Sequence, residues 1–99
     1  MLGMFVTFQY DGDFDRERVV KVAAGARDMF EGMPGLRNKF FTVDEANRRA
    51  VNFYAWDWED AGLEFFTDEL RERVTGLYGT APAIDFVEIV ELVDNSSDE

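Results

Sequence analysis

The sequence contains no cysteine and no histidine among its 99 residues. The lack of cysteine excludes a disulfide scaffold and thiolate chemistry. Without either residue, the chain cannot form a Ser-His or Cys-His catalytic pair, a histidine-ligated haem site or the usual zinc ligand set. The glycine patterns of phosphate-binding and dinucleotide-binding loops are also missing. The sequence therefore predicts no metal centre and gives no local support for a nucleotide cofactor.

Positive charge is also scarce. The chain has 10 Lys and Arg residues against 21 Asp and Glu residues, which gives a net charge of −11. Nucleic-acid binding gains affinity from cations that displace counterions, so this balance argues against a nucleic-acid partner. Such an acidic surface repels itself at low salt and is screened at high salt. It suits a halophilic, salt-rich cytoplasm, and an acidic protein from an ordinary cytoplasm fits equally well.

Long apolar runs are missing too. None reaches the roughly 18 residues that a membrane-spanning helix needs. The first residues, MLGMFVTF, are apolar but have no basic leader and no small-residue cleavage site. We therefore expect a cytoplasmic protein with no membrane contact. A chain of this length makes one domain, which we place at residues 1–94, and the polar residues 95–99 are predicted to form a disordered tail.

The chain is rich in apolar and aromatic residues, at 46% and 15%, and it includes ten phenylalanines. Alternating apolar residues predict strands, and apolar residues at helical spacing predict helices. Gly32 and Pro34 end the first helix, and Pro82 precedes the last strand. The predicted elements are a strand at 2–10, a helix starting near Asp13 and Asp15, strands at 36–43 and 48–56, a helical stretch at 61–77 and a strand at 84–93.

The sequence alone does not decide two features of the helices. Thr67 and Asp68 could cap a fresh start within the second helical stretch, so it is either one kinked helix or two short ones. The first helix has only alanine and glycine at residues 23–26, so it either lies close on the sheet or leaves space above it. The close packing of protein interiors favours the first of these arrangements.

The predicted order is strand, helix, strand, strand, helix, strand. The commonest topology for this order is the ferredoxin-like βαββαβ fold of class α+β, a four-stranded antiparallel sheet with its helices on one face. The other sheet face also carries apolar residues, and soluble monomers rarely expose such a surface. We therefore expect a homodimer that packs sheet against sheet.

Several short motifs follow one another in a fixed order along residues 2–93. They are GMPGL at 32–36, Lys39, the turn acids Asp44 and Glu45, Tyr54 and Trp56 before Asp57, the helix start from Ala61 to Phe65, and the strand led by Pro82. In this order they resemble the dimeric α+β barrel superfamily, and more narrowly its YdhR-like monooxygenases, relatives of the antibiotic biosynthesis monooxygenases. One departure is Trp58, which stands where the relatives tend to have a small capping residue.

The resemblance implies a homodimer whose sheets form a barrel, with a pocket in each subunit between the helices and the sheet. It also implies oxidation of a small phenolic or quinol-like aromatic molecule by molecular oxygen, without flavin, haem or metal. Hydrogen-bond donors and aromatic walls suffice for such a site. Many members of the family have no demonstrated reaction.

Strand alternation places Asn52, Tyr54 and Trp56 on one face, where they offer an amide, a phenol and an indole N–H. Lys39 or Asn38 joins them, depending on the register of the hairpin. We expect the catalytic residues to be Asn52, Trp56, Tyr54 and Lys39, and the substrate contacts to be Asn38, Phe65 and Tyr78.

Other interpretations stay open. Tyr54, Trp56 and Tyr78 are also typical core residues, and Lys39 also suits a contact with a surface acid. The Asn52 amide fits either a pocket group or a hydrogen bond to a neighbouring loop. Arg37, Arg48 and Arg49 fit solvated hairpin ends, or pairing with a substrate carboxylate or a second subunit. Two alternatives on the same fold are a non-catalytic small-ligand-binding or stress-associated dimer and an isomerase of the muconolactone type.

Overall fold

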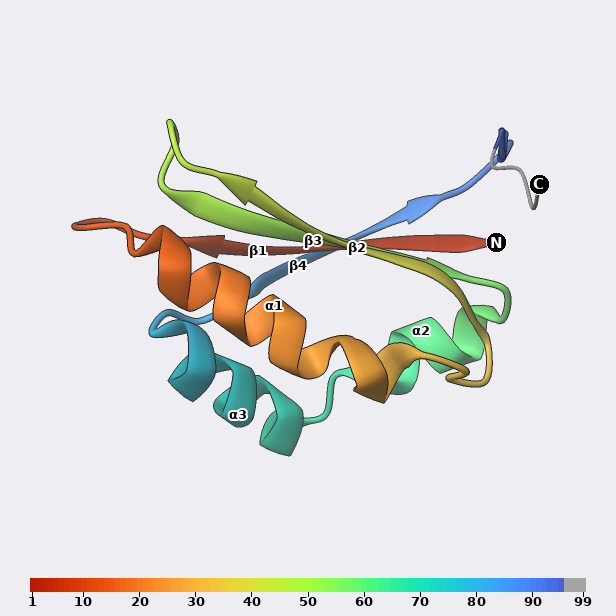
Figure 1. Cartoon of the computed structure of the whole chain (residues 1–99). Helices are drawn as coiled ribbons and strands as arrows, with labels where there is room; N and C mark the ends of the chain where they lie inside the picture. The colour runs from red at the N-terminus through yellow and green to blue at the C-terminus, as the bar shows by residue number, and fades with distance from the viewer. Residues whose placement is uncertain (96–99) are drawn as a thin grey trace.

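The computed structural model describes residues 1–95 and has the predicted ferredoxin-like α+β fold. Four antiparallel strands form one sheet in the order β2-β3-β1-β4, and all three helices cover the same face of it (Figure 1). Of the predicted tail, residues 96–99 lie outside the described residues. The elements are β1 (Leu2–Gln9), α1 (Arg16–Phe30), β2 (Leu36–Asp44), β3 (Arg49–Trp56), α2 (Glu59–Phe65), α3 (Asp68–Tyr78) and β4 (Ala83–Glu88).

Short polar side chains cap the N-termini of two helices, α1 and α3. The Asp15 carboxylate accepts a hydrogen bond from the backbone N–H of Arg18, as expected from the acids before α1. The Thr67 hydroxyl accepts one from the backbone N–H of Leu70, so the second helical stretch is two helices. At the start of α2, Trp58 forms no capping hydrogen bond through its side chain, in keeping with its unusual residue type there.

A set of hydrogen bonds joins the end of α3 to the start of α1 and to Tyr10, which directly follows β1. The Arg18 guanidinium donates to the carbonyl oxygens of Leu77 and Gly76, at 3.0 and 3.1 Å. The Tyr10 hydroxyl donates to the carbonyl oxygen of Tyr78 at 2.6 Å. These bonds satisfy carbonyl groups that the last turn of a helix otherwise leaves without partners. The end of α3 and the start of α1 are thereby held together beside the sheet.

The core lies between the helices and the sheet. Its largest fully buried side chains are Trp56, Phe8, Met4 and Val6. Helix α2 lies very close to β3 at Gly62. A methyl group at this position would come within 2.7 Å of the Trp56 ring. Glycine is therefore required where α2 crosses Trp56. No helix among residues 1–95 has the length and hydropathy to span a membrane.

The last strand is shorter than the sequence predicted. Strand β4 ends at Glu88, opposite Leu2, the first residue of β1. One more backbone bond follows, from the N–H of Ile89 to the carbonyl oxygen of Met1 at 3.0 Å. Beyond it, Val90 and Val93 are 82% and 79% exposed. The prediction of a strand to residue 93 is wrong because alternation alone does not supply a partner strand.

Within residues 1–95, the sheet face away from α1, α2 and α3 has no helix over it (Figure 1). This face carries several apolar side chains. On this face Phe40, Val87 and Phe5 are 55%, 42% and 37% exposed. Phe53 lies between Phe5 and Phe40, with ring centroids 4.8 and 6.5 Å from theirs. We call Phe5, Phe40, Phe53 and Val87 the outer-face patch.

Candidate functional site

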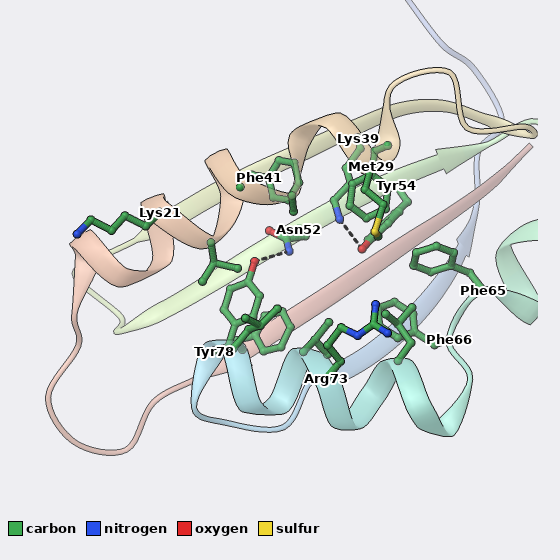
Figure 2. Close-up of a pocket in the computed structure, with 18 residues that line it drawn as sticks. Lys21, Met29, Lys39, Phe41, Asn52, Tyr54, Phe65, Phe66, Arg73 and Tyr78 are labelled. Carbon is green, nitrogen blue, oxygen red and sulfur yellow. Dashed lines mark hydrogen bonds between the residues drawn. The ribbon is translucent and has the colours of Figure 1, made fainter.

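A cavity of about 480 Å³ lies between the helices and the sheet (Figure 2). It exists because the middle of α1 is thin: a methyl group at Gly25 would meet no atom within 4 Å. The expectation that α1 packs closely at this point is wrong. The cavity volume falls in the range of small-molecule sites. The lining residues are Phe8, Lys21, Val22, Gly25, Ala26, Met29, Phe30, Lys39, Phe41, Asn52, Tyr54, Phe65, Phe66, Leu70, Arg73, Val74, Leu77 and Tyr78.

The register of the β2–β3 hairpin decides which β2 residues face the cavity. Lys39 pairs with Tyr54, so its side chain lies on the helix side of the sheet. An irregularity between Leu36 and Asn38 inserts one extra residue and places Asn38 opposite Ala55. Asn38 therefore belongs to the opposite face at this point of the sheet and is not part of the cavity lining. The alternative that the sequence left open is resolved in favour of Lys39.

The Lys39 amine is held in an aromatic enclosure. Its Nζ lies 3.6, 3.9 and 4.3 Å from the ring centroids of Phe30, Tyr54 and Phe41, and it donates a hydrogen bond to the Tyr54 hydroxyl at 2.5 Å (Figure 2). Burial disfavours the charged form and lowers the pKa of Lys39 to about 7. The ring faces act in the opposite direction because they attract the ammonium. Both protonation states of the amine are accessible near neutral pH.

A second polar pair spans the cavity between the sheet and α3. The side-chain amide of Asn52, which is 4% exposed, donates a hydrogen bond to the Tyr78 hydroxyl at 3.2 Å (Figure 2). This bond offsets the cost of burying the amide in mid-strand. Burial raises the pKa of Tyr78, although the Asn52 bond works against this shift. Burial also raises the pKa of Tyr54, so both phenols stay protonated hydrogen-bond donors at neutral pH.

Aromatic rings from α2 and the sheet form one end of the cavity. Phe65 contacts Tyr54 at a ring-centroid distance of 5.5 Å and Trp56 at 5.2 Å. Phe65 lines the cavity, whereas Trp56 lies beneath α2 and does not. Trp56 is 1% exposed, and its Nε1 has no hydrogen-bond partner among residues 1–95. The structure therefore places Trp56 in the core, contrary to the expectation that it lines the site.

The hairpin arginines lie outside the cavity. Arg37 pairs with Asp57 at 2.7 Å, and Arg49 pairs with Asp44 at 2.8 Å. The hydrogen bonds that Asp44 accepts from Asn47 and Arg49 lower its pKa. Among residues 1–95, no group of three or more acidic side chains is arranged to hold a metal ion.

Sequence reasoning missed several lining residues. Phe41 lies two residues after Lys39 on the same strand face, so alternation was sufficient to find it. Phe30 closes the enclosure from the last turn of α1, and nothing in the sequence indicates that contact. Arg73 lines the cavity from α3, where it ends the charged run Arg71-Glu72-Arg73, and such a run is typical of a solvated face.

Three solved structures have closely similar folds. The monooxygenase of ActVA-Orf6 from Streptomyces coelicolor, in complex with the ligand nanaomycin D, is 23% identical, with a TM-score of 0.69 over 96% of this chain and 92% of its own. SnoaB, a cofactor-independent oxygenase from Streptomyces nogalater, solved as a mutant, is 14% identical, with a TM-score of 0.67 over 93% and 95%. A Nitrosomonas europaea protein of unknown function is 18% identical, with a TM-score of 0.66 over 97% and 95%.

This chain has the fold of these three proteins. No family model matches the sequence, and no curated protein matches it either. At these low identities the likeness concerns the fold and leaves substrate and activity open. A putative antibiotic biosynthesis monooxygenase from Deinococcus radiodurans is 15% identical, with a TM-score of 0.60 over 98% of this chain and 100% of its own. The expected relation to this group is confirmed as a shared fold, while the narrower YdhR-like relation stays a prediction.

Proposed function

We propose that this protein binds a small phenolic aromatic molecule in the cavity and oxidises it with molecular oxygen without a cofactor. The observation that carries the proposal is the Lys39 amine, which is enclosed by three rings and hydrogen-bonded to Tyr54 at the wall of an apolar cavity. Two proteins with the same fold, a cofactor-independent oxygenase and a monooxygenase with a bound ligand, support it by analogy.

The neutral Lys39 amine takes the proton from the substrate phenol, and the resulting ammonium is stabilised by Phe30, Phe41 and Tyr54. The phenolate then shares its charge with the conjugated ring, and a ring CH carbon that carries this charge bonds to molecular oxygen. The peroxide anion that results takes the proton back from the Lys39 ammonium. Loss of water from the peroxide leaves a carbonyl. One oxygen atom stays on the substrate and the other leaves as water.

The hydroxyls of Tyr54 and Tyr78 are the donors that orient the substrate anion, and Asn52 orients Tyr78. Their raised pKa values keep these hydroxyls protonated while the substrate is deprotonated. The apolar walls exclude water that would otherwise protonate the reactive carbon. Phe65 and Phe66 supply aromatic surface for the substrate ring.

We also propose that the working form is a homodimer joined through the outer-face patch. A second copy that packs on this face removes the exposed rings of Phe5 and Phe40 from water. The cavity lies on the other face of the sheet, so each subunit keeps its own site.

Oxygen consumption with a panel of dihydroxynaphthalenes and hydroxyanthrones tests the activity. We expect Lys39→Met to lower the rate by about 100-fold, as for loss of a general base. Lys39→Arg should lower it as strongly, because a guanidinium cannot release its proton near neutral pH. Full activity in the Met variant would exclude Lys39 as the base.

Two further outcomes separate this proposal from its alternatives. If a ligand quenches the tryptophan fluorescence and no oxygen is consumed, the protein binds small ligands without oxidising them. Turnover of a lactone substrate without oxygen would instead indicate an isomerase. Measurements under argon and under air, with the same protein sample, distinguish these cases.

A further inference from the structure

The cavity lining differs in charge from the rest of the molecule. It contains Lys21, Lys39 and Arg73 and no carboxylate, in a chain with a net charge of −11. Both lysines of the chain are among these residues. A site lined by one sign of charge attracts ligands of the opposite sign. The cavity is thus suited to an anionic ligand, although the protein as a whole repels anions.

Arg73 is the cation best placed to hold such a ligand. Unlike those of Arg37 and Arg49, its side chain forms no hydrogen bond or ion pair within residues 1–95. Figure 2 shows its side chain extending from α3 toward Phe66, whereas the Lys21 side chain points away from the other labelled residues. A planar guanidinium can bind both oxygens of one carboxylate.

We infer that the substrate is an aromatic carboxylic acid whose carboxylate is bound by Arg73. This inference rests on the proposed function, because it assigns one end of the same substrate. Lys39 and Tyr54 project from the sheet, and Arg73 comes from the helix layer that covers it. Carboxylate and phenol are therefore held by opposite walls of the cavity.

A matched pair of ligands tests the inference. The probes are 6-hydroxy-2-naphthoate and its neutral amide, 6-hydroxy-2-naphthamide, which have nearly the same shape and carry the two groups at opposite ends of the ring system. We expect the carboxylate to bind at least about tenfold more tightly by isothermal titration calorimetry, because a bidentate pair with arginine is one of the stronger single contacts. Arg73→Gln should abolish this difference, and Arg73→Lys should keep part of it.

Arg71→Gln is the matched control. Arg71 is an exposed arginine on the same helix and does not line the cavity, so its loss changes the net charge equally. We expect this variant to keep the preference for the carboxylate. A loss of preference as large as in Arg73→Gln would show a general charge effect and overturn the inference.

The remaining outcomes separate the inference from the proposed function. Equal binding of the two probes would overturn the carboxylate inference and leave an aromatic-binding cavity. Binding of neither probe would overturn the proposed function, and the inference with it. A carboxylate preference that survives in Arg73→Gln would assign the anion to another cation and overturn the role of Arg73.

Discussion

Lys39 shows how one buried side chain can link stability to pH. The amine lies against three rings, and its only hydrogen bond in residues 1–95 goes to Tyr54. Its pKa falls from 10.5 to about 7 in the folded protein. Between these two values the unfolded chain binds a proton that the folded chain does not, so protonation favours unfolding. Stability must then rise with pH across this window.

We predict that the free energy of unfolding increases from pH 7 to pH 9.5, by at most about 1.4 kcal/mol per pH unit. The ring faces around the ammonium make the slope smaller. Lys39→Met should flatten the curve and be more stable than the wild type at pH 7. Urea unfolding at half-unit pH steps measures both curves. Parallel curves for the two proteins would show that Lys39 is not the source of the pH dependence.

At the residue scale, the sequence predicted well which side chains share a strand face. Asn52 and Tyr54 lie on the cavity side of β3, as alternation indicated. Alternation does not say what covers that face, and therefore Trp56 was expected in the site although α2 buries it. The choice between Lys39 and Asn38 depended on one extra residue in β2, which has no sequence signature here.

Among the elements, the two glycines of α2 and α3 have opposite structural roles. A methyl group at Gly62 would come within 2.7 Å of Trp56 and Leu2, whereas one at Gly76 would meet no atom within 4 Å. The residue at position 62 is thus fixed by the packing of α2 on the sheet. The residue at position 76 is limited only by helix propensity.

The same substitution should consequently change stability in opposite directions at these two sites. Gly76→Ala should stabilise the protein by about 0.5–1 kcal/mol, because alanine loses less backbone entropy in a helix. Gly62→Ala should destabilise it by about 1–3 kcal/mol through overpacking. Chemical denaturation of both variants measures the difference. A stabilising Gly62→Ala would mean that α2 does not lie against Trp56.

Elements set by local signals were predictable, and elements set by distant partners were not. The starts of α1 and α3 follow from Asp15 and Thr67, which cap their own helices. The end of β4 depends on where β1 begins, and the cavity depends on how α3 lies relative to the thin part of α1. Neither relation is encoded in a short window of sequence.

At the scale of the whole molecule, two surface properties have opposite effects on the association of two copies of the chain. The outer-face patch favours contact with a second copy, whereas a net charge of −11 on each chain repels it. Salt screens the repulsion and leaves the apolar contact intact. Dimerisation through the sheet should therefore strengthen as the salt concentration rises.

We predict by light scattering a mass of twice 11.4 kDa at high salt, and partial dissociation at low salt and low protein concentration. Phe40→Asp should yield a monomer, because it puts an unpaired charge within the proposed contact. Leu63→Asp is the control: Leu63 is 49% exposed on α2, in the helix layer, and should leave the dimer intact. A wild-type monomer at every salt concentration would contradict pairing through the outer-face patch. If Phe40→Asp and Leu63→Asp dissociate the dimer equally, the contact between the two copies does not lie on the outer-face patch.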